Sequence, residues 1–403
     1  MIDVVGLGAS GWTSLGPGER DLVTCAEHLL GSERQLALIP DTAATRTAWP
    51  RPLRPALPQL LADHEHTRTV VLASGDPLVA GIGTTLVELF GPPAVRVHPA
   101  VSSVALARAR MGWPAETVEV VRVCGAGADE IRRLLTPGRR VVVLSRDART
   151  PAAVARVLVD AGFGPSPMAV LSHLGGPQES RVDSLAQRWD GDRAVPDLNL
   201  VCVTCSPAYA SPLWSSAPGL PDDAYEHDGQ LTKRDVRAAA LAQLMPVPGQ
   251  LLWDVGAGAG SVGIEWLRSH PACRAVAVER DPDRAARVAR NAAHLGVHTL
   301  DVVTGAAPAA LGDLPRPDAV FVGGGASDDT FEQAWHALAG GGRLVAHAVT
   351  VETEQLLLDQ WRRHGGQLTR LSVEQLEPLG GYAGWRPARA VVQWSVQKPL
   401  ATP

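Results

Sequence analysis

The sequence predicts two consecutive α/β domains. In both halves of the 403-residue chain, short apolar runs with strand character alternate with helical stretches, a pattern typical of largely parallel sheets covered by helices. Between the halves, residues 206–230 are rich in Pro, Ser, Gly and Asp and show neither strand nor helix periodicity. We therefore expect domains at 1–208 and 227–403, joined by a linker at 209–226.

The expected elements alternate in the same way along both halves. In the first half, we expect helices at 18–30 and 150–162 and strands at 2–7, 68–74, 95–98, 118–123, 139–145, 168–172 and 198–203. In the second half, we expect helices at 232–244, 261–270 and 283–296 and strands at 250–256, 274–279, 300–305, 318–324 and 342–350. Two closing runs, 367–376 and 388–396, are expected to pair as an antiparallel end of the second sheet.

The composition argues against several classes of protein. Charged residues make up 20% of the chain and the formal net charge is −5. Without a basic excess or a Lys/Arg-rich tail, we expect no nucleic-acid partner. No run of about 18 apolar residues predicts a membrane span. No signal peptide precedes the first strand, so we expect a cytoplasmic protein.

The cysteines and one histidine pair predict no metal site. Five cysteines are too few, and odd in number, for a disulfide framework. Cys202 and Cys205 lie in an apolar run, and residues three apart on a strand face opposite sides. His64 and His66 alternate in a polar stretch without a third ligand nearby. We interpret the first pair as core and the second as solvated surface.

The stretch LLWDVGAGAGS at 251–261 carries the strongest nucleotide-binding signal. A strand ends at Asp254, and Gly256, Gly258 and Gly260 allow a tight turn with close backbone approach to a ligand. The helix that follows offers free N–H groups at its N-terminus. Glu279 ends the next strand, where an acid can accept hydrogen bonds from ribose hydroxyls.

Nicotinamide enzymes and methyltransferases both use such an acid. The loop reads D-x-G-x-G-x-G, and the acid before the glycines can support the cationic methionine end of S-adenosylmethionine. A dinucleotide loop faces pyrophosphate and has no such need. The order of elements, with its antiparallel end, also favours a methyltransferase. An NAD(P)-dependent reductase and a tight turn without a ligand remain alternatives.

Further motifs of the second half extend the comparison to one family. In order, they are HDGQLTKRDVRA (227–238), LLWDVGAGAGSVGIEW (251–266), VTGAAPAAL (303–311), PDAVFVGGG (317–325) and GGRLVAHAVTVET (341–353). They resemble the cobalamin-pathway methyltransferase domain that decarboxylates precorrin, which implies a seven-stranded Rossmann-like fold. The resemblance also implies a cofactor site lined by Thr232, Asp254, Gly256, Ala257, Gly258, Ala259, Gly260, Glu279, Gly305 and Ala306. Many methyltransferases of this fold have an acid where this chain has Ala306, so a side-chain role there is in doubt.

The first eleven residues, MIDVVGLGASG, contain a formal G-x-G-x-x-G match. A dinucleotide loop runs directly into a helix, but here Gly11 is followed by the turn-forming WTSLGPG, and no strand-end acid follows at the required distance. LASGDPLVAGIG (72–83), VHPAVSSVALARARMGWP (97–114) and VLSHLGGPQESRV (170–182) instead resemble the two-lobed tetrapyrrole methyltransferases. That family resemblance implies cofactor binding by Gly75, Asp76, Gly81, Ser102 and Ser103, and substrate contact at Gly8. His173 stands where the family often has an acid, and its role stays open.

Fusion of the two domains resembles the decarboxylating precorrin methyltransferases of aerobic cobalamin synthesis. The resemblance implies methylation of precorrin-6B, also called precorrin-6Y, at carbons 5 and 15, with loss of carbon dioxide from an acetate side chain, to give precorrin-8X. The first domain would methylate carbon 5, and the second carbon 15. Methyl transfer from S-adenosylmethionine to an enamine-like carbon needs alignment in a dry site rather than a metal or an enzyme nucleophile.

A tetrapyrrole substrate carries many carboxylates, so basic residues are expected around both sites. For these basic residues, named below, the alternative is a solvated basic face that binds no ligand. For the protein, the alternatives are a methyltransferase that acts on a macromolecule and a binding module without enzymatic activity. A homo-oligomer is expected, with a tetramer formed through the C-terminal domain as the candidate assembly. The candidates for substrate binding are Arg46, Arg51, Arg54, Lys233, Arg234, Arg237 and the backbone of Gly323, Gly324 and Gly325; those for proton transfer are His227 and Asp228.

Overall fold

The computed structural model describes residues 1–63, 67–123, 127–209 and 214–400. The chain divides into two compact units: residues 1–128 with 137–211, and residues 129–136 with 212–403. The surface expected at His64 and His66 lies outside the described residues. Within these ranges, no helix is both long and apolar enough to span a bilayer.

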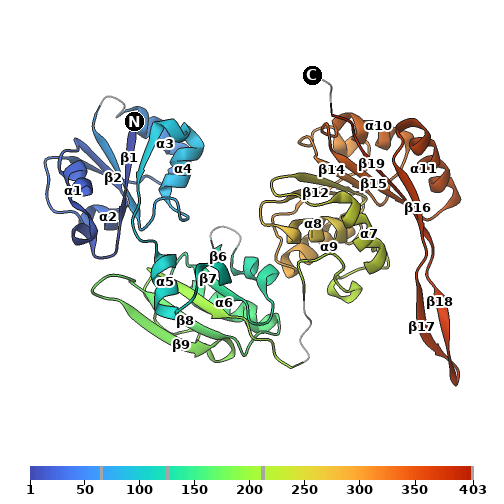
Figure 1. The fold of residues 1–403 in the computed structure, drawn as a ribbon, viewed down its shortest axis with the longest axis horizontal. Helices are drawn as coiled ribbons and strands as arrows, with labels where there is room; N and C mark the ends of the chain where they lie inside the picture. The colour runs from blue at the N-terminus through green and yellow to red at the C-terminus, as the bar shows by residue number, and fades with distance from the viewer. Residues whose placement is uncertain (64–66, 124–126, 210–213, 401–403) are drawn as a thin grey trace. The chain divides into compact units, whose positions relative to one another are not determined.

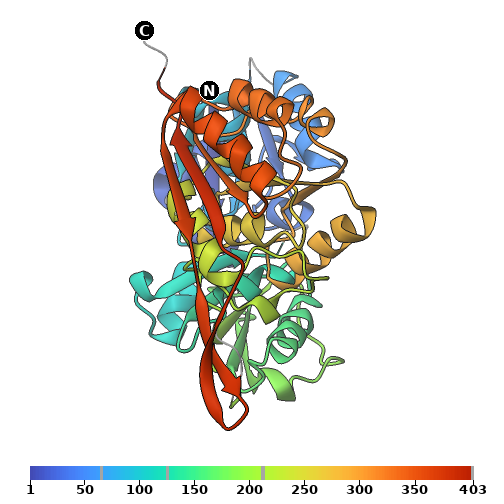
Figure 2. The same cartoon turned by 90° about the vertical axis from the view of Figure 1, so that its right-hand side faces the viewer.

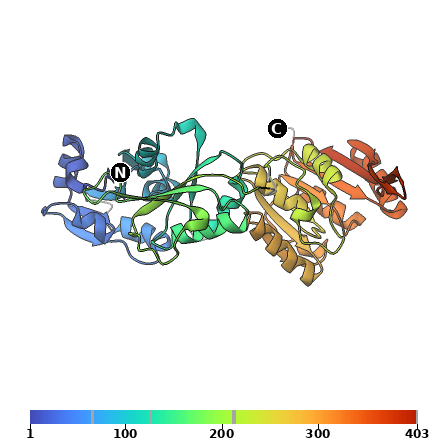
Figure 3. The same cartoon turned by 90° about the horizontal axis from the view of Figure 1, so that it is seen from below.

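The first unit contains two five-stranded sheets, which Figure 1 shows as separate lobes; Figure 3 shows the same unit from below. The first sheet is parallel, with the order β3-β2-β4-β1-β5. Its strands are β1 (Ile2–Leu7), β2 (His28–Gly31), β3 (Thr45–Ala48), β4 (Thr69–Ser74) and β5 (Val95–His98). Its helices are α1 (Pro17–Thr24), α2 (Glu33–Ala37), α3 (Leu53–Ala62) and α4 (Ile82–Phe90).

The second sheet of this unit is mixed, with the order β6-β7-β10-β8-β9. Only β6 and β7 run parallel among its neighbouring strands. The strands are β6 (Val118–Arg122), β7 (Arg140–Leu144), β8 (Pro167–Ser172), β9 (Ser180–Leu185) and β10 (Asn199–Thr204), and the helices are α5 (Ser103–Met111) and α6 (Thr150–Asp160). Cys202 is buried on β10 and Cys205 is buried just after it, as expected.

The helix expected at 18–30 is wrong in its second half. Helix α1 ends at Thr24, and β2 begins at His28. Leu29 and Leu30 are fully buried because β2 pairs with both β3 and β4. Strand pairing at long range therefore overrides the local helical pattern.

The second unit contains a seven-stranded sheet with the order β13-β12-β11-β14-β15-β19-β16. Strands β11 to β15 are parallel, and β19 runs antiparallel between β15 and β16. This arrangement confirms the expected seven-stranded methyltransferase fold. The strands are β11 (Leu251–Val255), β12 (Arg274–Glu279), β13 (Asp301–Thr304), β14 (Ala319–Val322), β15 (Arg343–Ala348), β16 (Gln367–Leu371) and β19 (Val391–Gln397), and the helices are α7 (Arg234–Leu244), α8 (Ser261–Ser269), α9 (Pro282–His294), α10 (Asp328–Ala337) and α11 (Val351–His364).

The run expected at 367–376 is two strands rather than one. Strand β16 ends at Leu371, and the chain leaves the sheet to form a hairpin of β17 (Glu374–Leu379) and β18 (Tyr382–Pro387). Figures 1 and 2 show this hairpin extending beyond the end of the sheet.

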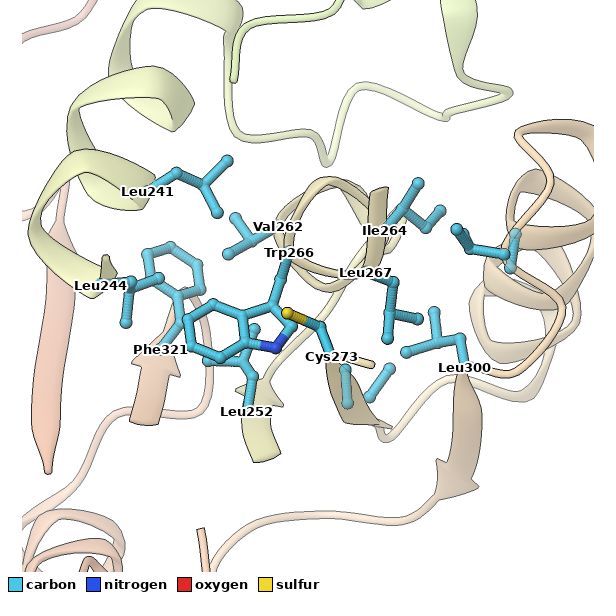
Figure 4. Packing of buried hydrophobic residues seen from close by; sticks show 14 of the residues in the cluster. Leu241, Leu244, Leu252, Val262, Ile264, Trp266, Leu267, Cys273, Leu300 and Phe321 are labelled. Carbon is cyan, nitrogen blue, oxygen red and sulfur yellow. The ribbon is translucent and has the colours of Figure 1, made fainter. Parts of the chain in front are cut away.

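Helix α8 is buried on almost every side and fixes the start of the site. All residues from Ser261 to Arg268 are buried. Figure 4 shows the Trp266 indole among side chains from α7, α8, β11 and β14. Its Nε1 donates to the carbonyl of Arg274 at 2.9 Å, which satisfies its buried polar atom. The helix therefore holds the preceding glycine loop in one position.

Candidate functional site

A cavity of about 1310 Å³ lies in the second unit, beside the carboxyl ends of its parallel strands. The strand order reverses at β11, which lies between β12 and β14. Ligands of open α/β sheets bind at such a switch point. Of the residues expected from the sequence, twelve line this cavity: Thr232, Lys233, Arg234, Gly256, Ala257, Gly258, Glu279, Gly305, Ala306, Gly323, Gly324 and Gly325.

Backbone contacts explain why the loop after β11 needs glycine. Gly256 has φ +68°, and a Cβ there would lie 2.5 Å from the carbonyl oxygen of Gly324. Gly258 has φ +60°, and its Cβ would lie 2.8 Å from the carbonyl oxygen of Gln230. Both neighbours are backbone atoms, which cannot move aside as a flexible side chain would. The loop thus passes close to two other segments of the cavity wall.

Glu279 connects this loop to the end of β12. Its Oε2 accepts the N–H of Gly258 at 2.8 Å, and its Oε1 accepts the N–H of Asp281 at 3.1 Å. The side chain is only 4% exposed, yet it lines the cavity. Each carboxylate oxygen has a second lone pair, so Glu279 can still accept hydrogen bonds from a ligand.

Asp254 does not line the cavity, contrary to the sequence interpretation. Its Oδ2 accepts the N–H of Gly263 at 2.8 Å, and burial raises the pKa of its carboxyl to about 7. Gly260 packs against Val288, where a Cβ would lie 2.7 Å away, and Ala259 is 1% exposed. These three residues therefore act behind the loop, by fixing its connection to α8, rather than as direct cofactor contacts.

Arg237 was expected to bind substrate, but its guanidinium is fully buried. Its Nε donates to Glu265 Oε1 at 2.6 Å, and its Nη1 lies 3.3 Å from Asp222 Oδ1. It also donates to the carbonyl of Leu220 and stacks 4.8 Å from the centroid of the Tyr225 ring. A substrate carboxylate has no access to it. The structure assigns Arg237 to the attachment of residues 220–225 onto α7 and α8.

Replacing Arg237 with leucine is expected to lower the free energy of unfolding by about 3–5 kcal/mol, because it leaves a buried Glu265 carboxylate without its cation. Chemical denaturation of the full chain measures this change. The exposed Arg234→Leu variant is the control, with an expected change within about 0.5 kcal/mol. Equal stability of the two variants would restore the substrate-binding interpretation of Arg237.

The structure argues against the predicted proton-transfer pair, His227 and Asp228. Asp228 Oδ2 lies 2.9 Å from Arg284 Nε and 3.1 Å from Arg287 Nη1. These guanidiniums, Arg284 first, hold the pKa of the Asp228 carboxyl far below its usual value, so it has no proton to donate near neutral pH. His227 is exposed and accepts the N–H of Gly229. Neither side chain is among those that line the cavity.

The sequence interpretation missed one wall of the cavity. This wall is the hairpin foot, which we define as Leu371, Val373, Gln375, Glu377, Arg386, Pro387, Ala388, Arg389 and Val391. His347 on β15 and Val349 adjoin it. His347 lies inside a buried strand pattern, and Arg389 lies between strands, so neither has a local sequence signal.

In the first unit, the predicted loops meet at the ends of β1 and β4. A Cβ on Gly6 would lie 2.5 Å from the carbonyl oxygen of Gly75 and 2.8 Å from Ala100. Asp76 Oδ1 accepts the N–H of Leu78 at 2.8 Å, which closes the turn after β4. Strand β1 therefore brings the first glycine motif against the two segments expected to bind cofactor.

The other predicted residues of these loops have identifiable local roles. Ser102 caps α5 by accepting the N–H of Ala105 at 3.1 Å, and Ser103 is the first residue of that helix. Gly8 donates its N–H to Ser14 Oγ at 3.1 Å. A Cβ on Gly81 would lie 2.5 Å from the carbonyl oxygen of Pro77.

Two of the three candidate arginines of the first unit, Arg46 on β3 and Arg54 on α3, are engaged elsewhere. Arg46 donates to the carbonyls of Leu36, Ile39 and Pro40, and so holds the segment after α2. Arg54 pairs with Glu88 at 3.0 Å. These contacts argue against a substrate role for both side chains, whereas Arg51 is exposed.

Comparison with known proteins covers the whole chain. Residues 1–188 match the tetrapyrrole (corrin/porphyrin) methylases, and residues 223–398 match a precorrin methyltransferase domain. A decarboxylating precorrin-6Y C(5,15)-methyltransferase from Mycobacterium tuberculosis (strain CDC 1551 / Oshkosh) is 46% identical over 99% of this chain and 100% of its own length. A relative of the same name from Sinorhizobium sp is 42% identical over 98% of this chain and 96% of its own length. Among solved structures, the C-terminal domain of precorrin-6Y C5,15-methyltransferase from Rhodobacter capsulatus is 47% identical over 46% of this chain and 100% of that chain, with a TM-score of 0.44.

Proposed function

Because the chain belongs to the family of decarboxylating precorrin-6Y C(5,15)-methyltransferases, we propose a division of labour between its two units. The enzyme methylates a precorrin, a tetrapyrrole of cobalamin biosynthesis, and decarboxylates it. In our proposal, the first unit methylates carbon 5, and the second methylates carbon 15 and releases carbon dioxide. The expected alternative, an NAD(P)-dependent reductase, is not supported by these relatives.

The observation that carries the proposal for the second unit is the loop after β11 and its acid. Gly256 and Gly258 leave a backbone cradle that a Cβ would fill, and Glu279 closes its far side. This donor and acceptor set fits S-adenosylmethionine, with Glu279 accepting from the ribose hydroxyls. Gly305 and Ala306 would border the adenine by backbone and packing. The cofactor supplies an electrophilic methyl group when bound.

The residues of the chain then have three tasks: to orient the acceptor carbon, to exclude water and to hold the carboxylates. Transfer needs the acceptor carbon, the methyl carbon and the sulfur in line, with the two carbons about 3 Å apart. Gly323, Gly324 and Gly325 follow β14 and present bare backbone, against which a flat macrocycle can lie. Lys233 and Arg234 at the start of α7 line the cavity and are exposed, which supports contact with substrate carboxylates. Lys233 Nζ also lies 3.5 Å from Asp222 Oδ2, so a substrate carboxylate would share or replace that pairing.

For the first unit, the support is the meeting of the β1 loop with the loop after β4 and the start of α5. We propose that the second S-adenosylmethionine site is built there, from Gly75, Asp76, Gly81, Ser102 and Ser103. We also propose that Gly8 contacts the substrate and that the protein is cytoplasmic. The domain limits at residues 208 and 227 remain part of the proposal.

The test is incubation of the full chain with precorrin-6Y and isotopically labelled S-adenosylmethionine. Mass spectrometry of the product should show two methyl groups gained and one carbon dioxide lost. A product with no labelled methyl group would reject the proposal. A shift of thermal unfolding by NADPH, with none by S-adenosylhomocysteine, would favour the reductase.

The hairpin is the proposed route to a homo-oligomer, which we expect to be a tetramer. Leu376, Leu379, Tyr382 and Trp385 are 58–86% exposed along its two strands. Leu376 pairs with Trp385 and Leu379 with Tyr382, and residues three apart on a strand point to opposite sides, so both faces of the hairpin carry exposed apolar side chains. A two-stranded hairpin uncovered in this way is only marginally stable by itself. Other copies of the chain would cover these side chains.

Replacing Trp385 with glutamate is expected to dissociate the oligomer, because it puts a charge where an aromatic side chain would be buried. Light scattering coupled to size-exclusion chromatography gives the mass of the particle. Glu374→Gln, an exposed substitution on the same hairpin, is the control. A wild-type chain that elutes as a monomer would refute the proposed assembly.

A further inference from the structure

The cavity of the second unit has two halves that differ in chemistry. Over β11, β12 and β13 it is lined by Gly256, Gly258, Glu279 and Gly305, the residues proposed to hold the cofactor. Over β14, β15 and β19 it is lined instead by the three glycines at 323–325, His347, Val349, Val391 and the rest of the hairpin foot. The second half is therefore the place for the methyl acceptor.

His347 is the one side chain of this half that is both buried and able to make directional polar contacts. It lies near the carboxyl end of β15 and is 9% exposed. Directly across the strand pair, Gln393 on β19 accepts from its Nε2, with 2.9 Å between Nε2 and Oε1. Phe321 packs edge-on against the ring, with 5.0 Å between centroids. The imidazole is thus held in place from two sides.

The contact with Gln393 determines which ring nitrogen remains for a ligand. An amide oxygen only accepts, so Nε2 carries the hydrogen and Nδ1 keeps a free lone pair in the neutral ring. Burial lowers the pKa of His347 to about 4, so the ring is neutral at physiological pH. Among the described residues, no donor is found for Nδ1. A hydrogen-bond acceptor is therefore available at the wall of the acceptor half.

We propose that His347 Nδ1 accepts a hydrogen bond from a pyrrole-type N–H of the tetrapyrrole and so orients the macrocycle for transfer to carbon 15. This inference rests on the proposed function of the cavity and adds a specificity-determining residue to it. A reduced tetrapyrrole offers N–H donors at its centre, while its carboxylates lie at its periphery. His347 Nδ1, a neutral acceptor in the cavity wall, and the exposed cations that line the cavity match that distribution.

Arg389 is suited to the peripheral contact. It is exposed, lines the cavity from the hairpin foot, and has no ion-pair partner among the described residues. Arg386, its neighbour in the hairpin foot, is instead paired with Glu377 at 3.1 Å. Arg389 can therefore bind a substrate carboxylate without breaking an existing pair.

Two variants of similar size separate the two nitrogens of His347. Asparagine places its polar atoms near the position of Nδ1, and glutamine places them near that of Nε2. We expect H347N to keep the KM for precorrin-6Y in carbon-15 methylation within about threefold, and H347Q and H347L to raise it about tenfold. Affinity for S-adenosylhomocysteine should stay unchanged in all three. His336→Gln, on α10 outside the cavity, is the control.

The double variant H347N/Q393L protects the test against misfolding, because it removes the glutamine that H347N leaves without a partner. The inference is overturned if H347Q and H347L keep the wild-type KM. It is also overturned if H347L weakens S-adenosylhomocysteine binding as much as precorrin-6Y binding, since His347 would then contact the cofactor. Failure of the wild-type chain to transfer a second methyl group would instead reject the proposed function.

Discussion

Replacing Glu279 with glutamine should suppress carbon-15 methylation at limiting S-adenosylmethionine and leave carbon-5 methylation unchanged. Glu279 accepts two backbone N–H groups and still faces the cavity. Glutamine has one accepting oxygen, and its NH₂ group would oppose a backbone donor. Hydrogen bonds to a charged group contribute about 1.5–3 kcal/mol each. We therefore expect the KM for the cofactor in carbon-15 methylation to rise about 10- to 100-fold.

The full chain provides an internal reference for this experiment, because carbon-5 methylation is proposed to use the other unit. Product masses at a series of cofactor concentrations give both reactions from one sample. Glu332→Gln, an exposed carboxylate on α10 outside the cavity, is the matched control. An E279Q chain that adds both methyl groups with the wild-type cofactor dependence would contradict the ribose-binding role.

The cofactor half of the cavity could be predicted from sequence because its signals are short motifs at characteristic spacings. Glycine spacing after β11 reflects the approach of Gly256 to Gly324, and Glu279 ends the next strand at a fixed distance along the chain. The alternation of strands and helices gave the fold class for the same reason. In each case a short motif identifies the element, even where the contact that requires it, such as that of Gly256 with Gly324, is distant in sequence.

Residues whose partners are distant in sequence were misassigned. Lys233 and Arg237 are four residues apart near the start of α7, a spacing that by itself predicts a common helix face. Arg237 instead points inward to Glu265, 28 residues later on α8. The same applies to Asp228, whose partners Arg284 and Arg287 lie on α9. A charge pattern along one segment does not show which side will be buried.

The hairpin foot was missed for a related reason. Leu371 and Glu374 are separated by only two residues, and the sequence has no turn signal strong enough to divide them into two strands. The division becomes visible only because β19 returns between β15 and β16. As a result, the part of the acceptor half formed by His347 and the hairpin foot, including Arg389, could not be predicted from the sequence pattern, whereas the glycines at 323–325 were expected there.

Two glycine-to-alanine substitutions should separate the two methylations. Gly256→Ala places a Cβ 2.5 Å from the carbonyl oxygen of Gly324, at a residue with φ +68°. Gly6→Ala places a Cβ 2.5 Å from the carbonyl oxygen of Gly75. Neither clash can be relieved by rotating a side chain, so each loop must move. A shift of about 1 Å at a reacting centre can cost about 100-fold in rate.

We expect Gly256→Ala to give a product methylated only at carbon 5, and Gly6→Ala one methylated only at carbon 15. Gly18→Ala and Gly312→Ala are the controls, because a Cβ at either position meets no atom closer than 3.7 Å. The methylation that each variant retains shows that its chain is folded.

Mixing the two variants should restore the doubly methylated product if the intermediate leaves one unit and enters the other from solution. If the mixture stalls at single methylation, the intermediate passes between units of one chain. Loss of both methylations in either variant would contradict separate sites, because a clash confined to one loop would then have disabled both units.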